Sequence, residues 1–250
     1  MNLKLQTQNF KSQKGNINFI RLLFAVTGLL AFCHVVGLFI GEYAWQWERL
    51  FRLDGESNIP TWFSSLLLAS CAFVSFRCYE AAEKRDRWIW FLATAGFLFL
   101  SCDEVAMLHE TVGSIFKKKF VTSESVLANA PTIWPVAVSP LIALGMLWFG
   151  VFIPKAMRNS KEALKLVMMG FALYLFATVG LELLEDFIQG DSLSWAREAN
   201  TLFEESLEMI GAIMILKGLL IQWKVLMSAE TPEVTSRFDD ENQRLNPCQA

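Results

Sequence analysis

The sequence is poor in the side chains from which most metal and thiol sites are built. Its 250 residues include two histidines and five cysteines, and no two cysteines form a C-x-x-C pair. Most of the cysteines fall inside apolar segments, so neither a disulfide framework nor a thiolate zinc site is expected. The E-x-x-H, H-E-x-x-H, G-x-S-x-G, P-loop and dinucleotide-binding motifs are also absent. These absences argue against the di-iron bundles, metalloproteases, serine hydrolases and nucleotide-binding folds that the motifs define.

Charge is also scarce. Charged residues make up 19% of the chain and hydrophobic residues 54%, whereas soluble domains usually carry about 25% charged residues. The net charge of −3 is too small to imply a nucleic-acid partner. No signal peptide is expected, because a long polar stretch precedes the first apolar run. Apolar runs of about 20 residues recur, and this is the length that crosses a hydrocarbon core.

These runs predict an all-α integral membrane bundle of six transmembrane helices. The predicted spans are residues 19–41, 59–78, 88–110, 131–153, 164–186 and 200–223. They form one transmembrane domain, 19–227, between a disordered N-terminal arm, 1–18, and a disordered C-terminal tail, 228–250. Because the connections are short, neighbouring helices are expected to pack antiparallel.

Lysine and arginine predict the orientation. Most of the 22 basic residues lie in the N-terminal arm, in the second and fourth connections and after the last span. By the positive-inside rule these segments face the cytoplasm, so both termini are expected to be cytoplasmic. The exception is Lys117–Lys119 in the loop 111–130, which also carries apolar side chains. We interpret that loop as an interfacial anchor in preference to a dedicated phosphate site.

Nine carboxylates lie at the ends of three predicted spans. They are Asp103, Glu104, Glu110, Glu182, Glu185, Asp186, Glu204, Glu205 and Glu208. The predicted topology brings all nine to the outer third of the bundle, and spacings of three, four or seven residues place several on common helix faces. A charged side chain at this depth costs about 2–3 kcal/mol by insertion scales. Such a layer therefore needs metal, protons or water to neutralise it.

Depth along the helices divides the candidate residues into two rings, since each residue adds about 1.5 Å. The inner ring is expected to hold His34, Asp103, Glu182 and Glu208. The ring above it is expected to hold Glu104, His109, Glu185 and Glu205. A structural role in the core is an equally good interpretation of His34. The carboxylates at the helix ends could also lie at the level of the lipid headgroups, where such residues are ordinary.

The candidate metal ligands are Asp103, Glu182, Glu208, His34, Glu185 and Glu205. The candidate catalytic groups are Glu104, as proton shuttle, and His109. An oxygen-rich site with one or two imidazoles suits Fe, Mn, Mg or Ca better than Zn. We therefore favour a metal-dependent membrane hydrolase acting on a lipid or other apolar substrate. A cation- or proton-coupled transporter and a non-catalytic scaffold or sensor are the alternatives.

Four stretches carry a resemblance. LDGESNIPTWFSSLLL (53–68), FLSCDEVAMLHE (99–110), GLELLED (180–186) and EESLEMIGA (204–212) resemble a widespread family of uncharacterised bacterial multi-pass membrane proteins. The resemblance implies an inner-membrane location and brings no known activity.

A weaker similarity is to the membrane hydrolase superfamily of alkaline ceramidases and progestin-type receptors, which use zinc. The matching residues would be Asp54, Glu56, Asn58, Ser64, Asp103 and His109. The paired histidines of that superfamily's last helix are missing, and Glu204, Glu205 and Glu208 stand in their place.

Overall fold

The computed structural model describes residues 3–40, 45–122, 133–185 and 194–245, and every regular element among them is a helix. Six helices are long and apolar enough to cross a membrane. They are α1 (Leu3–Ile40), α3 (Ile59–Ala81), α4 (Arg87–Ala106), α7 (Ser139–Ala156), α8 (Lys161–Leu175) with its continuation, and α10 (Ser194–Leu245). The predicted all-α, multi-pass membrane bundle is therefore confirmed.

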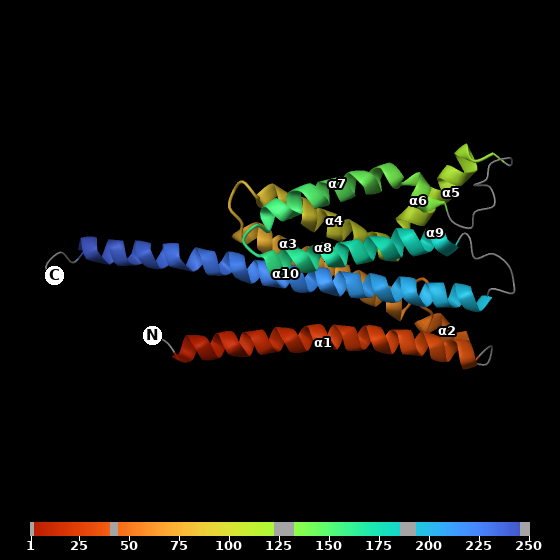
Figure 1. Ribbon diagram of the computed structural model, residues 1–250, viewed down its shortest axis with the longest axis horizontal. Coiled ribbons are helices and arrows are strands. Elements are labelled where there is room, and N and C mark those ends of the chain that lie inside the picture. The colour runs from red at the N-terminus through yellow and green to blue at the C-terminus, as the bar shows by residue number, and fades with distance from the viewer. Residues whose placement is uncertain (1–2, 41–44, 123–132, 186–193, 246–250) are drawn as a thin grey trace.

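The first and last helices extend beyond the spans predicted from hydropathy. The helical backbone of α1 begins at Leu3, and that of α10 continues to Leu245. It thus runs through much of the two segments, 1–18 and 228–250, for which the sequence predicts disorder. Hydropathy marks where a helix enters the lipid, whereas helix propagation adds one backbone hydrogen bond per residue whatever the solvent. The start of α1 and the end of α10 lie at the same end of the bundle (Figure 1).

The long helix α10 is the centre of the packing. It contacts α1, α3 and α8, while α3 also packs along α4 (Figure 1). Its buried face includes Met209, Ile213 and Leu216, a spacing of three and four residues that forms one helical stripe. By contrast, many large apolar side chains on α1, α4 and α7 remain exposed, as lipid-facing side chains should be.

Glycine permits the close approach of α8 and α10. A methyl group added at Gly170 would lie 2.7 Å from the carbonyl oxygen of Gly211, and one added at Gly211 would lie 2.8 Å from that of Gly170. Gly218 similarly faces Val167 and the backbone of Ala163. Small residues at such a contact let membrane helices approach until their backbones touch.

Three short helices complete the acidic end, which is the end of the bundle where α4 stops and α10 begins. They are α2 (Trp45–Phe51), α5 (Leu108–Phe120) and α6 (Trp134–Ala137). Asn58 caps α3 there by accepting the Thr61 N–H at 3.0 Å, with Pro60 in the first turn. Asparagine and proline both favour helix starts.

Three predicted spans are interrupted at this end. The fourth was predicted as one helix over 131–153, but it divides at Val138 into α6 and α7. The third was predicted as one helix over 88–110, but Met107 adopts a left-handed backbone (φ 49°, ψ 46°) that separates α4 from α5. In the fifth, predicted over 164–186, α8 passes into a π-helical turn, η3 (Phe176–Leu181), and then α9 (Glu182–Glu185). Short π-helical insertions within helices occur frequently at functional sites.

Candidate functional site

The break at Met107 creates a hydrogen-bonded pair of side chains. It turns the chain so that His109 lies back against Asp103, four residues before the break. One oxygen of Asp103 accepts the His109 backbone N–H at 2.9 Å, and the other lies 2.8 Å from Nδ1 of the ring. Asp103 therefore caps the start of α5 and at the same time orients the imidazole. Left-handed backbone is uncommon for a residue such as methionine and points to a local constraint.

Trp134 links His109 to a further carboxylate, that of Glu182. The two rings meet edge to face with centroids 4.6 Å apart, and the indole N–H of Trp134 donates to Glu182 at 3.3 Å. Gly113 allows this contact, because a methyl group there would lie 2.8 Å from Cβ of Trp134. Elements α5, α6 and α9 are thus joined at one place.

Electrostatics favour a proton on His109. Burial disfavours the charged ring, but the hydrogen bond and charge of Asp103 outweigh it, with Glu110 and Glu182 adding to the effect. The pKa of His109 is therefore raised above its ordinary value. Because His109 stays 29% exposed while Asp103 is 16% exposed, the ring can exchange protons with molecules outside the bundle.

Three carboxylates gather deeper in the bundle. Glu104 of α4 and both Glu205 and Glu208 of α10 interact electrostatically with one another. Ser64 lies near Glu104, and Thr178, in the π-helical turn, lies near Glu208. Glu104 also interacts with Asp103 and His109. The described residues thus form a chain of acids that leads from His109 into the bundle.

The structure brings together most, but not all, of the predicted site residues. Glu182 lies within electrostatic reach of both His109 and Glu208. Asp103 was predicted as a metal ligand, but both of its carboxylate oxygens hydrogen bond with His109. Glu204 is buried beside Asn200, whereas Glu110 is exposed. The side chain of Glu185 and all of Asp186 lie outside the described residues.

Among the described residues, no three His, Cys, Asp or Glu side chains are arranged to hold a metal ion. The predicted divalent metal (Fe, Mn, Mg, Ca or Zn) therefore stays a prediction.

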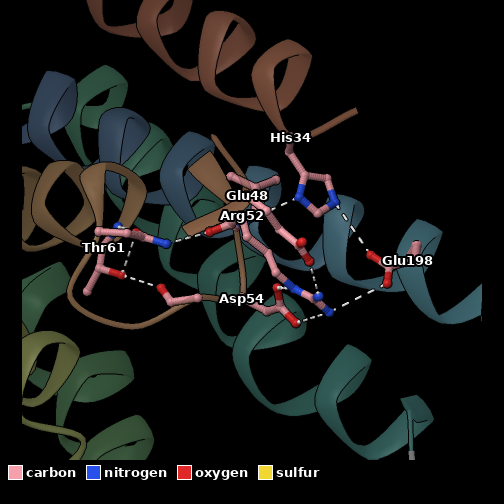
Figure 2. Close-up of polar contacts among 9 residues, drawn as sticks. His34, Glu48, Arg52, Asp54, Thr61 and Glu198 are labelled. Carbon is pink, nitrogen blue, oxygen red and sulfur yellow. Dashed lines mark hydrogen bonds and ion pairs between the residues drawn. The ribbon is translucent and has the colours of Figure 1, made fainter. Parts of the chain in front are cut away.

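His34 belongs to a second polar cluster, shown in Figure 2. Its Nδ1 accepts the Leu53 backbone N–H at 3.2 Å, and its Nε2 lies 3.8 Å from Glu198. Arg52 bonds Glu48 at 2.8 Å and Asp54 at 2.6 Å, and it reaches Glu198 at 3.5 Å. The hydrogen bond with Asp54 raises the pKa of Arg52 further, so the guanidinium stays charged. His34 is therefore placed with Glu198 and Arg52, and not with the predicted inner ring.

Several residues of these two clusters were not singled out from the sequence. They are Arg52, Trp134, Tyr174, Thr178 and Glu198. One signal was available, because Glu198 and Glu205 are seven residues apart and so share a face of α10. Nothing in the sequence marks Trp134 or Thr178, which reach the site through the helix interruptions.

The sequence matches, over residues 20–223, a family described as a domain of unknown function (DUF8692). The chain belongs to this family. The matched region spans all six membrane helices and both polar clusters, so the DUF8692 domain is the transmembrane bundle itself. No curated protein and no solved structure matches the chain.

Proposed function

We propose that this chain is a membrane-embedded enzyme that hydrolyses a lipid or another apolar substrate at the acidic end of the bundle. The observation that carries the proposal is the hydrogen-bonded pair of Asp103 and His109, whose ring is partly exposed and lies within electrostatic reach of the half-buried Glu104. The location would be a bacterial inner membrane, as the family resemblance implies, with the acidic end on the outer side.

In the proposed reaction His109 acts as general base. Nδ1 is held by Asp103, which leaves Nε2 to take a proton from the attacking water, while the Asp103 carboxylate stabilises the imidazolium that forms. Glu104 interacts with His109 electrostatically, so it is placed to return a proton to the leaving group. Glu205 and Glu208 would supply or store that proton.

Hydrolysis can be detected without knowing the substrate, because one oxygen atom of water enters the product. The purified protein is reconstituted in vesicles of the expression host's total lipid in ¹⁸O-water, and lipids are surveyed by mass spectrometry. The expected result is a product heavier by one ¹⁸O atom that forms with the wild type and not with His109→Gln. Equal labelling by both proteins, or no labelled product with either, would rule the proposal out.

A second candidate is a proton pathway, favoured by the mutual electrostatic interaction of Glu104, Glu205 and Glu208 inside the bundle. Acids within membrane-spanning helices often mark proton relays. Proteoliposomes containing a pH-sensitive dye distinguish the two functions. A proton flux that Glu208→Gln abolishes, without any ¹⁸O product, would favour the relay.

A further inference from the structure

A cavity of about 240 Å³ opens beside His34, away from the Asp103–His109 pair. Residues of α1, α2 and α10 line it, including His34, Trp47, Arg52 and Glu198. It could hold several water molecules at about 30 Å³ each, or the headgroup of a small ligand. His34 is only 2% exposed, so the structure has buried a polar ring against this space.

The hydrogen bond from Leu53 fixes the state of the His34 ring. A backbone N–H can only donate, so Nδ1 must be the acceptor of the 3.2 Å bond and carries no hydrogen. We therefore assign the neutral tautomer with its hydrogen on Nε2. It follows that the contact of Nε2 with Glu198 is not an ion pair, and that Nε2 has no lone pair to offer a metal ion.

Two buried polar atoms at the cavity lack partners among the described residues. They are Nε2 of His34, a donor, and Oε2 of Glu198, an acceptor, and they lie 3.8 Å apart. That separation is too long for a hydrogen bond. Leaving a buried polar atom unpaired is unfavourable, so a bound group that satisfies both atoms would be favoured.

The two atoms select the chemistry of that group. It must accept from Nε2–H and donate to the Glu198 carboxylate, and a hydroxyl does both with one oxygen atom. An ammonium group cannot accept, and a carboxylate or phosphate cannot donate when ionised. We propose that this cavity binds the hydroxyl group of a lipid alcohol, at a site separate from the proposed hydrolytic centre.

The walls of the cavity favour a lipid over a soluble polyol. Trp47 and Phe51 lie beside each other with ring centroids 4.6 Å apart, and both line the space. Leu38 also lines it and is 47% exposed, next to Phe39, which is 86% exposed. An apolar surface thus continues from the cavity along α1 to the lipid-facing side, where an acyl or alkyl chain would lie.

The test uses an ether lipid that a hydrolase cannot cleave, so it does not depend on the proposed activity. Native mass spectrometry of the protein follows the binding of 1,2-di-O-oleylglycerol, its 3-O-methyl ether, and glycerol. The expected result is that the free alcohol binds at least tenfold more tightly than the methyl ether, which cannot donate a hydrogen bond.

Two variants locate the site. Glu198→Ala removes the acceptor but leaves the His34–Leu53 bond intact, and it should weaken binding of the alcohol at least tenfold. Asp54→Asn is the matched control, because Asp54 also pairs with Arg52 but does not line the cavity; it should bind as the wild type does. Melting temperatures of both variants separate lost binding from lost folding.

Three outcomes would overturn the proposal. Equal binding of the alcohol and its methyl ether would show that no hydroxyl is recognised. Binding of glycerol alone that depends on Glu198 would make the ligand a soluble polyol. If neither probe binds the wild type in preference to Glu198→Ala, water alone fills the cavity.

Discussion

At the scale of single residues, Asp103 has two functions that a substitution can separate. One oxygen holds the His109 backbone and the other holds the ring. An asparagine keeps one carbonyl oxygen for the backbone N–H but loses the negative charge beside Nδ1. Folding and proton affinity should therefore respond differently to this change.

The first prediction concerns pH. His109 accepts a proton only when it is neutral, so hydrolysis should rise as pH rises through the raised pKa of His109. Asp103→Asn removes the main stabiliser of the charged ring, so the pKa falls and the rising limb should move to lower pH, with a lower maximal rate. The measurement is a pH–rate profile of the ¹⁸O reaction, with Glu110→Gln as the comparison. An unmoved limb in Asp103→Asn would contradict the assignment of His109.

The second prediction concerns the three carboxylates that interact inside the bundle. Glu104, Glu205 and Glu208 repel one another when ionised, so Glu208→Gln should raise the melting temperature, by the equivalent of about 1–2 kcal/mol. Thermal unfolding and elemental analysis are measured together on the wild type and the variant. If the variant instead loses a stoichiometric metal ion and melts earlier, the predicted divalent metal is present and bound there.

The sequence located the acids but not their partners. Depth along each predicted helix brought Glu104, Glu182, Glu205 and Glu208 to one end. The structure places Glu104, Glu205 and Glu208 within electrostatic reach of one another, and Glu182 within reach of Glu208. The sequence could not separate His34 from these acids, because equal depth in the membrane does not determine which neighbours a helix face contacts. His34 faces α2 and the start of α10, and that choice depends on tertiary packing.

At the scale of elements, the helix interruptions at Met107 and at Phe176–Leu181 could not be read from the sequence. Met107 is a good helix former in an apolar run, with no glycine or proline beside it. Asp103 holds the left-handed turn at Met107 in place, because it contacts His109 beyond the turn. One of its oxygens accepts the His109 backbone N–H, and the other hydrogen bonds with Nδ1 of the ring. The π-helical turn at Phe176–Leu181 is similarly satisfied from outside, since Asn200 donates to the carbonyl oxygen of Leu181 at 3.1 Å.

The third prediction concerns the contact between α8 and α10. Gly211→Ala would place a methyl group 2.8 Å from the carbonyl oxygen of Gly170, so the helices must separate and stability should fall by about 1–3 kcal/mol. Gly145→Ala is the control, because an added methyl group there meets nothing within 4 Å. Unfolding in detergent measures both. Equal stability of the two variants would mean that α8 and α10 do not approach as closely as described.

At the scale of the whole molecule, hydropathy was sufficient to predict the bundle. Crossing a membrane requires length and apolar composition, which are local properties of the chain, and each of the six predicted spans overlaps a membrane-length helix. An even number of spans puts both termini on one side, as Figure 1 shows for α1 and α10. Which side that is depends on basic residues and stays a prediction.

The fourth prediction is this orientation. Reporter fusions at the C-terminus, after Gly55 and after Gly190 should show a cytoplasmic C-terminus and two external loops, because most lysines and arginines lie on the side of the termini. The external loops would place the acidic end outside. An external C-terminus would move both polar clusters to the cytoplasmic side.

The most direct test of the account uses the fact that the chain has two histidines. Nitrogen NMR of protein labelled with ¹⁵N-histidine, in lipid bilayers, reports the protonation of each ring as pH changes. One ring is expected to be neutral at pH 7 with its hydrogen on Nε2. Its signals are assigned to His34 because they disappear in His34→Gln. The second ring is expected to have a raised pKa, which falls in Asp103→Asn. Two rings with the same ordinary titration, unchanged by Asp103→Asn, would contradict the Asp103–His109 pair on which the proposed function stands.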